Sequence, residues 1–187
     1  MPSSVTADVT SDAVDPTDPV EFRRTMAEFA SGVTVVTAVH VGEPVGFACQ
    51  SFSSVSLEPP LVLFCVDRRS RSWRGIQSAG RFCVNVLAED QGELCQRFGS
   101  SRGLRFDGLT WALSSWDTPS LPGVLARIHA DVHSVHPEGD HDIVIGHVVA
   151  MERSRVGRPM VFFRGRFGID ADERDAHVTW SWLDGWI

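Results

Sequence analysis

The sequence contains no lysine and no tyrosine, so its 17 strongly basic side chains are all arginines. These two absences exclude Schiff-base chemistry on a lysine and acid catalysis by a tyrosine. The sequence also lacks any apolar run near the roughly 18 residues that a membrane-spanning helix requires. We therefore expect a soluble protein that makes no membrane contact.

Excess positive charge is also lacking. The formal net charge is −7 and the arginines form no long basic block, which argues against a nucleic-acid partner. A local group of arginines can still bind a small phosphate-bearing ligand. The four cysteines form no C-x-x-C pair, and their mainly apolar surroundings predict buried free thiols. Because no secretion signal precedes Arg23, we expect a cytoplasmic protein.

The length of 187 residues favours one domain. Residues 1–17 contain almost no large apolar side chains and are predicted to be disordered. Residues 18–187 are predicted to form the domain, which ends in a tail that contains Trp180, Trp182 and Trp186.

A short helix is predicted at the start of this domain. Asp18 can cap it, and Phe22, Met26 and Phe29 recur at helical spacing until Gly32 ends the pattern. We expect this apolar face to lie on the core.

Strand patterns dominate the rest of the sequence. Segments rich in β-branched and aromatic residues and bounded by Gly, Pro or Ser occur at 33–39, 45–56, 61–66, 82–87, 126–136, 142–153 and 160–167. Two short helices fit near 70–78 and 90–98. Such a meander favours a mainly β protein with an antiparallel barrel. No G-x-G-x-x-G or Walker motif is present, so a nucleotide would be held in another way.

Polar side chains interrupt the segment at 48–56. They are Gln50, Ser51, Ser53, Ser54 and Ser56. Serine is a poor strand former, so one interpretation is that these groups and the nearby backbone N–H groups line a polar ligand. The alternative is an edge strand with one wet face.

The segment "RRSRSWR" at 68–74 is a candidate phosphate site. Ser70 can cap a helix, and four arginines surround that helix start: Arg68, Arg69, Arg71 and Arg74. The alternative is an arginine-rich surface turn. The loop "GSSRG" at 99–103 is a weaker candidate of the same kind.

Histidines gather between 129 and 141 without the spacing of a zinc site, since there is no H-E-x-x-H and no nearby cysteine pair. A metal site is therefore not predicted. A Ser-His-Asp hydrolase is also disfavoured because no G-x-S-x-G elbow is predicted: the letters occur in "GSSRG" at 99–103, but that loop follows a predicted helix and not a strand. In "GRPMVFFRGRF", Arg164 and Arg166 are expected on the same side of one strand, either in solvent or beside a flat ligand that Gly165 admits.

Six segments occur in an order and spacing typical of one known family: "FRRTMAEFASGVTVVTA", "GFACQSFSSVSLEPPLVLFCV", "FCVNVLAEDQ", "RFDGLTW", "GDHDIVIGHV" and "MVFFRGRF". Together they cover about residues 22–169. They resemble the flavin reductase family, the reductase components of two-component flavin-dependent monooxygenases.

The resemblance implies an FMN-binding split barrel, usually a homodimer, that uses NADH or NADPH to reduce FMN or FAD. It also implies that the reduced flavin passes to a separate monooxygenase. Because the hydride moves from one cofactor to the other, we expect no catalytic side chain, and the task of the protein is to position the two cofactor rings. We expect backbone N–H groups of 48–54 to lie beside the flavin. An alternative is a split-barrel flavoprotein with tightly bound FMN, acting as an oxidase or as a non-catalytic binding module.

The resemblance also assigns residues. The flavin ring is expected beside Ala48, Cys49, Gln50, Ser51, Phe52, Ser54 and Val55. The ribityl phosphate is assigned to Arg69, Ser70 and Arg71, and a loop closing over the flavin to Ser101 and Arg102. The nicotinamide side is assigned to His141, with Arg164, Gly165, Arg166 and Phe167. The acids around His141 are expected to lie in water.

Three features depart from the family pattern. Cys49 and Gln50 stand where a small residue and an Asn are common, and Phe167 stands where a Tyr is frequent. The Trp-rich tail has no assignable counterpart. We therefore expect hydrogen bonding at the flavin strand to differ from the family's usual pattern.

Overall fold

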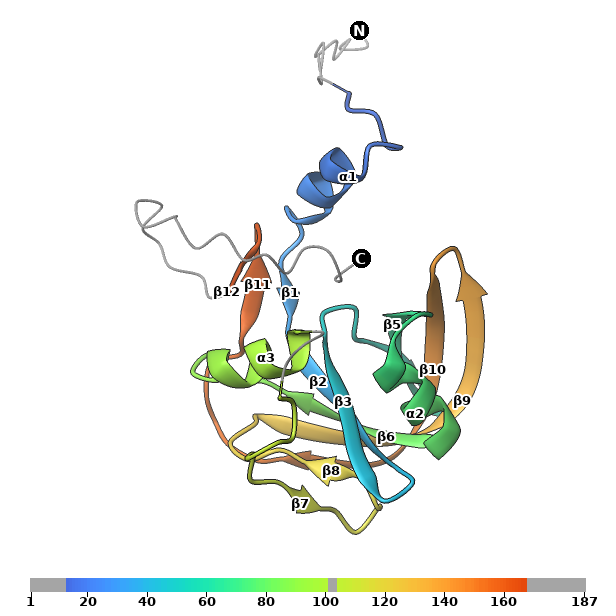
Figure 1. Cartoon of the computed structure of the whole chain (residues 1–187), viewed down its shortest axis with the longest axis vertical. Coiled ribbons are helices and arrows are strands. Elements are labelled where there is room, and N and C mark those ends of the chain that lie inside the picture. Colours follow the sequence, from blue (N-terminus) through green and yellow to red (C-terminus); the bar gives the residue numbers. More distant parts are fainter. Residues whose placement is uncertain (1–12, 101–103, 168–187) are drawn as a thin grey trace, which may run out of the picture.

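A computed structural model of the protein describes residues 13–100 and 104–167. Its main feature is a seven-stranded antiparallel sheet with the order β3-β2-β6-β9-β10-β5-β4 (Figure 1). The strands are β2 (Thr34–His40), β3 (Glu43–Cys49), β4 (Ser53–Leu57), β5 (Pro60–Asp67), β6 (Arg81–Val86), β9 (Ala126–Glu138) and β10 (His141–Arg153). This architecture confirms the mainly β, antiparallel barrel predicted from the sequence.

Three helices and two small sheets accompany the barrel in the described part of the chain. The helices are α1 (Pro19–Met26), α2 (Arg71–Ala79) and α3 (Gly92–Gly99). One small sheet combines β1 (Ser31–Gly32), β11 (Val161–Phe163) and β12 (Arg166–Phe167), and the other pairs β7 (Ala112–Leu113) with β8 (Pro119–Ser120). No helix among the described residues is long and apolar enough to cross a membrane.

The large sheet curls until its two ends approach each other. Phe47 on β3 and Phe64 on β5 lie with their ring centroids 5.8 Å apart. The edge strands β3 and β4 are joined by residues 50–52 and do not pair with each other in the described sheet. The barrel is therefore split at this point, and the connector lies at the split.

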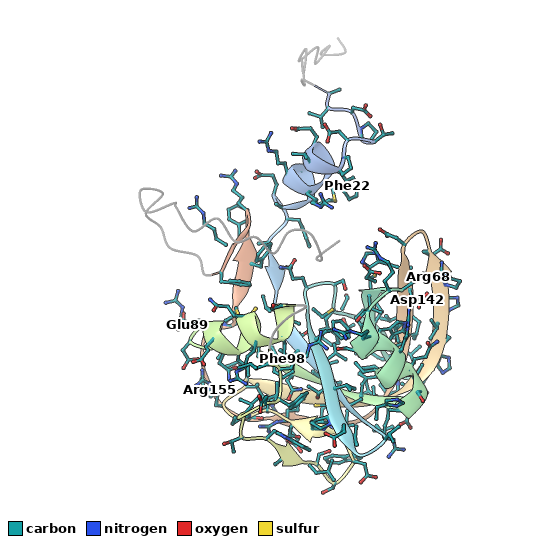
Figure 2. The ribbon with its side chains drawn as sticks, in the orientation of Figure 1. Phe22, Arg68, Glu89, Phe98, Asp142 and Arg155 are labelled. Carbon is teal, nitrogen blue, oxygen red and sulfur yellow. The ribbon has the colours of Figure 1, made fainter. Side chains whose placement is uncertain are left out.

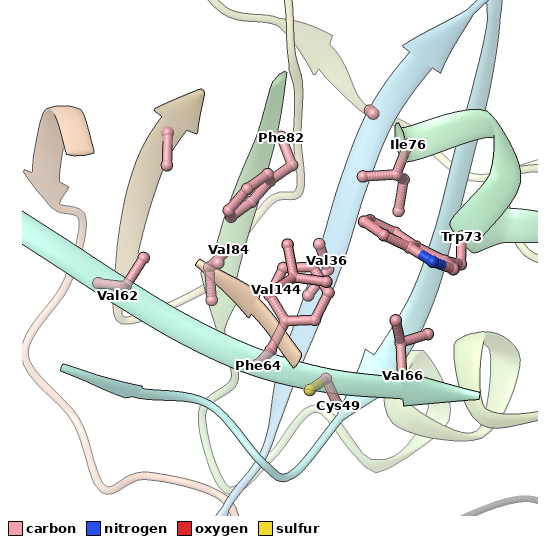
Figure 3. Packing of buried hydrophobic residues seen from close by; sticks show 12 residues of the cluster. Val36, Cys49, Val62, Phe64, Val66, Trp73, Ile76, Phe82, Val84 and Val144 are labelled. Atoms are coloured by element: carbon pink, nitrogen blue, oxygen red, sulfur yellow. The ribbon is translucent and has the colours of Figure 1, made fainter. Parts of the chain in front are cut away.

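Aromatic side chains fill the barrel core. Phe64 makes edge-to-face contacts with Trp73 of α2 and Phe82 of β6, at centroid distances of 5.9 and 5.2 Å (Figure 3). Helix α2 approaches the sheet closely because Gly75 has no side chain: a Cβ there would lie 3.3 Å from atoms of His40 and Val45. The core thereby fixes α2 against β2 and β3.

The prediction that the first helix lies on the core was wrong for a single copy of the chain. α1 begins at its Asp18 cap as expected, but it stands away from the barrel (Figure 1). Phe22, Met26 and Phe29 are 41%, 45% and 81% exposed. Helical spacing correctly identified an apolar face, but it could not tell which surface covers that face.

Two segments that were each predicted as one continuous strand form two strands in the structure. The segment 45–56 breaks at residues 50–52 into β3 and β4. The segment 160–167 turns back at Arg164 and Gly165, whose φ angles of 48° and 79° suit a two-residue hairpin turn. Arg164 and Arg166 therefore do not share one face of one strand. Gly165 permits this reversal, and its expected place beside a ligand stays a prediction.

Candidate functional site

The candidate site surrounds the carboxyl end of β5, where the chain enters α2. Ser70 caps α2, because its Oγ accepts a hydrogen bond from the backbone N–H of Trp73 at 3.3 Å. This confirms the predicted helix start. The first N–H groups of a helix have no intrahelical acceptor, so this end attracts anions.

The connector between β3 and β4 is tied to β5 by Ser51. The Oγ of Ser51 accepts from the backbone N of Cys65 at 2.8 Å and donates to its carbonyl at 3.1 Å. The same hydroxyl lies 3.3 Å from the Sγ of Cys49. One side chain thus replaces a stretch of backbone pairing at the split. Burial raises the pKa of the Cys49 thiol to about 11, so this thiol is neutral.

Gln50, the next residue along the connector from Cys49, has an unusual environment. Its Nε2 is buried and has no hydrogen-bond partner in the described protein. A buried amide donor without an acceptor costs about 1–3 kcal/mol. Such a group suits a carbonyl or a ring nitrogen supplied by a ligand.

Arg105 was missed by the sequence analysis as a site residue. Its Nη1 donates to the Oγ of Ser72 at 2.6 Å, and that hydroxyl donates to the carbonyl of Gly46 at 2.9 Å. The Nε of Arg105 is buried and has no partner in the described protein. Burial, and secondarily the nearby charge of Arg71, lower the pKa of Arg105.

A guanidinium in this setting calls for an anion. Among the described residues no carboxylate pairs with Arg105, and the positive end of α2 is beside it. The segment "RFDGLTW" supported the family resemblance, but nothing in the sequence indicated that its arginine reaches a serine 33 positions earlier.

Arg69 has a partner of its own within the chain. It binds the Asp67 carboxylate through Nε and Nη2, at distances of 2.9 to 3.2 Å, and lowers the pKa of that carboxyl. Arg71 is exposed at the first position of α2. The pairing with Asp67 offsets part of the positive charge that the sequence placed at this helix start.

His141 lies at the start of β10, opposite Asp67 on β5. Its Nδ1 is 2.7 Å from Oδ1 of Asp140, and this contact lowers the pKa of the Asp140 carboxyl. The imidazole side chain is 20% exposed, so it remains accessible at the end of the barrel. The structure therefore brings His141, Asp67 and Arg69 together.

The expectation that the acids near His141 lie in water was wrong for Asp142. Its Oδ2 accepts a hydrogen bond of 2.7 Å from Nε1 of Trp73, and its Oδ1 lies 3.6 Å from Nε of Arg68. Figure 2 shows Arg68 and Asp142 beside each other near the β9–β10 hairpin. Asp140 and Glu138 are exposed, as expected.

The remaining predicted residues are distributed over three places. Ser54 and Val55 are exposed on the edge strand β4, which is the wet edge that the alternative interpretation proposed. Ala48 is buried in a second core cluster, against which Phe167 packs. Arg164 pairs with Glu28 next to α1 at 2.7 Å. Ser101 and Arg102 lie outside the described residues.

His129 is a core residue. It is fully buried, its Nδ1 is 2.8 Å from the Thr118 hydroxyl, and its ring stacks on Trp116 at 4.6 Å. Burial lowers its pKa, although Glu152, 3.8 Å from Nε2, opposes that shift. Glu152 and Arg127 also line a cavity of about 420 Å³ that shares none of the predicted site residues.

The geometry fits a flat, phosphate-bearing ligand. The Gln50 amide nitrogen at the split and the Nε of the Arg105 guanidinium lack protein acceptors in the described structure, and the N-terminus of α2 lies beside that guanidinium. A flavin nucleotide offers ring carbonyls and nitrogens together with phosphate oxygens, so its acceptors match these donors. The donor set thus fits the group that the sequence resemblance implies.

Comparison with known proteins identifies similar chains. The reductase subunit HsaB of a flavin-dependent monooxygenase from Rhodococcus jostii (strain RHA1) is 44% identical over 99% of this chain and 100% of its own length. A structure of nitrilotriacetate monooxygenase component B from Mycobacterium thermoresistibile is 44% identical and has a TM-score of 0.78, covering 88% of this chain and 97% of that one.

A third similar structure is NADH:FAD oxidoreductase SgcE6 of Streptomyces globisporus C-1027, in complex with NAD and FAD fragments. It is 35% identical with a TM-score of 0.80, covering 88% of this chain and 100% of that one. The family model described as flavin reductase like domain matches residues 26–169. With that match across most of the barrel, the chain belongs to the flavin reductase family.

Proposed function

We propose that the protein is an NAD(P)H:flavin oxidoreductase that reduces FMN or FAD and supplies the reduced flavin to a separate monooxygenase. The observation that carries the proposal is the pair of buried donors without acceptors in the described chain: Gln50 Nε2 in the connector, and Arg105 Nε in the guanidinium that Ser72 of α2 holds. The names of similar proteins favour this activity over a tightly bound oxidase or a non-catalytic flavin-binding module.

The phosphate end of the flavin is assigned to the α2 start and Arg105. The Ser72 hydroxyl holds the Arg105 guanidinium beside the capped helix terminus. Arg71 adds a second, exposed positive charge, and Ser70 orders the first turn. We retain Arg69 at the rim of this site, where Asp67 orients it. Ser101 and Arg102 are retained as a covering loop on the resemblance alone.

The ring end is assigned to the connector and its flanks, from Ala48 to Val55. Ser51 fixes the connector to β5, which keeps the Gln50 amide in place. When bound, a reduced nicotinamide donates a hydride and an oxidised flavin accepts it. The protein's contribution is to orient the donors, exclude water and hold the two ligands in register.

The nicotinamide side is assigned to His141, at the open end of the barrel. The Asp140 carboxylate orients its imidazole, so the ring can present Nε2 to a ligand amide. Arg164 to Phe167 remain part of the proposal, with Phe167 close to the cluster that contains Ala48.

We also propose a homodimer in which a second copy covers α1. A helix of eight residues is far too short to be stable alone in water, and its apolar face is exposed in one copy. Closed twofold symmetry would cover this face on both subunits. The free thiols of the described cysteines suit a reducing compartment, which supports a cytoplasmic location.

NADH and NADPH oxidation measured with and without added FMN or FAD tests the activity. We expect turnover only when free flavin is present. Arg105→Gln should raise the flavin KM by about tenfold or more, because it removes a charged donor to phosphate. The matched control Arg158→Gln changes an exposed arginine that pairs with Glu89, and should leave the flavin KM unchanged. Equal flavin KM values for the two variants would contradict the phosphate role.

A further inference from the structure

We propose that Asp142 is a positioning residue for this site. Acting through Trp73 and Arg68, it would fix the phosphate-binding start of α2 to the strand end that carries His141. The inference rests on the proposed function, because it concerns how the two halves of that site are held in register.

The first contact joins Asp142 to the interior of α2. Nε1 of Trp73 donates to Oδ2 of Asp142 at 2.7 Å, across 69 positions of the sequence. Trp73 is only 1% exposed and the Asp142 side chain 13% exposed, so water does not readily replace either partner. A buried hydrogen bond to a carboxylate is stronger than one between neutral groups.

The second contact reaches the chain just before α2. Oδ1 of Asp142 lies 3.6 Å from Nε of Arg68, and the backbone N of Arg68 donates to the carbonyl of Asp140 at 3.1 Å. Asp142 therefore holds both the residue two positions before the Ser70 cap and the residue three positions after it. A single carboxylate thus contacts both the chain just before α2 and the first turn of that helix.

The groups next to these contacts are those assigned to the ligands. Ser72, which precedes Trp73, holds the guanidinium of Arg105 at 2.6 Å. His141, which precedes Asp142, belongs to the same strand β10. Successive side chains of a strand point to opposite faces, so Asp142 can bind α2 while His141 faces away from it. Asp142 thus connects the phosphate and nicotinamide sides through contacts within the protein.

Kinetics of Asp142→Ala provide the test. Loss of the carboxylate leaves a buried indole N–H without an acceptor and frees the α2 start. We expect the KM for flavin to rise by about tenfold and the KM for the nicotinamide nucleotide to rise with it, while kcat at saturation stays within about twofold. Asp142→Asn retains an oxygen acceptor for Trp73, so its flavin KM should lie close to the wild-type value.

Two comparisons separate positioning from general stability. Thr118→Val removes a buried hydroxyl that contacts His129, and it should lower the melting temperature without raising either KM. A double-mutant cycle combines Trp73→Phe with Asp142→Ala. The flavin KM of the double variant should be no higher than that of the single variant with the higher KM, because both changes remove the same Trp73–Asp142 hydrogen bond. Additive effects on KM would overturn the proposal, as would an Asp142→Ala KM equal to that of Thr118→Val.

Hydrogen exchange gives a readout that does not need activity. Asp142→Ala should speed exchange of the Trp73 and Arg74 amides, which donate to Ser70 at the start of α2, whereas Thr118→Val should not; equal exchange in both would overturn the proposal. A wild-type protein without flavin-dependent turnover would contradict the proposed function alone. Normal wild-type turnover with an unaffected Asp142→Ala variant would contradict the positioning role alone.

Discussion

At the scale of single residues, buried polar atoms without partners occur at two places in the described chain. Many buried polar groups are paired: the Asn85 amide, for example, donates to the carbonyl of Val35 and the hydroxyl of Thr37. Arg127 Nε and His129 Nε2, beside Glu152, form the first unpaired place, and the candidate site is the second. Gln50 Nε2 and Arg105 Nε have none in the described chain. We interpret the Gln50 and Arg105 donors as groups that a bound ligand completes.

Gln50→Leu tests this interpretation. Leucine removes the unpaired donor, so the ligand-free protein should keep or raise its melting temperature, while the Kd for flavin should weaken by about tenfold. Thermal melts and flavin fluorescence titration measure the two quantities. Gln77→Leu, on the exposed face of α2, is the control and should leave the flavin Kd unchanged. A less stable Gln50→Leu protein with normal flavin affinity would assign Gln50 to the fold instead.

The sequence predicted part of the site because some signals are local. The Ser70 cap and the arginines around it follow from short-range spacing, and His141 followed from its motif. The Arg105–Ser72 and Trp73–Asp142 contacts join segments 33 and 69 positions apart. No local pattern encodes such pairs, so only the folded chain shows them.

At the scale of elements, strand prediction succeeded where alternation or apolar runs were long. The strands expected near 126–136 and 142–153 correspond to β9 and β10, and the helices expected near 70–78 and 90–98 to α2 and α3. The interruption at residues 50–52 was missed because its cause is the Ser51 contact with β5. The reversal at 164–165 was missed because an arginine rarely adopts a positive φ, and Arg164 has one here.

Gly146 tests how tightly the strands enclose the core. A Cβ at this position of β10 would collide with the ring of Phe82, which is fully buried. Gly146→Ala should therefore destabilise the protein by about 1–3 kcal/mol, measured by denaturant unfolding. Gly92→Ala meets no atom within 4 Å at the start of α3 and serves as the control. Similar stability of the two variants would show that β10 can shift to make room.

At the scale of the whole molecule, α1 is the feature that a single copy does not explain. Its apolar face has no cover among the described residues, and Figure 2 shows Phe22 on the helix that stands away from the barrel. One domain over residues 18–187 stays a prediction, because the Trp-rich tail lies outside the described residues.

Molar mass in solution tests the role of α1. We expect the wild-type protein to elute as a dimer in light-scattering chromatography and Met26→Asp to shift toward the monomer, since burying an unpaired charge is costly. Glu21→Gln, on the same helix, should remain dimeric. A monomeric wild-type protein would contradict the proposal, and so would a fully dimeric Met26→Asp variant.

The pH dependence of stability should report on His129. Its folded-state pKa is lowered from 6.5 by burial, so the unfolded chain binds the proton more readily. The stability associated with neutral His129 is present above about pH 6.5 and is lost as the pH falls toward the folded-state pKa. The lowered pKa values of Asp67 and Asp140 act only in the more acidic range, below about pH 4.

Melting temperatures between pH 7.5 and 5 therefore test the contribution of His129 apart from those of Asp67 and Asp140. The wild-type melting temperature should fall across this window, and His129→Gln should show a flatter pH dependence even if it is less stable overall. His133→Gln, at an exposed position of β9, is the control. Equal slopes for wild type and His129→Gln would assign the pH dependence to other groups.

The most direct test of the central claim is anaerobic reduction of excess free flavin by NADH or NADPH with a catalytic amount of the protein, followed at the flavin absorbance near 450 nm. If the protein is a flavin reductase, many equivalents of flavin per protein will bleach, and bleaching will slow in Arg105→Gln at low flavin concentration. Bleaching of only about one equivalent would contradict that account and identify a protein that keeps the flavin it reduces. No bleaching at all would contradict reductase activity.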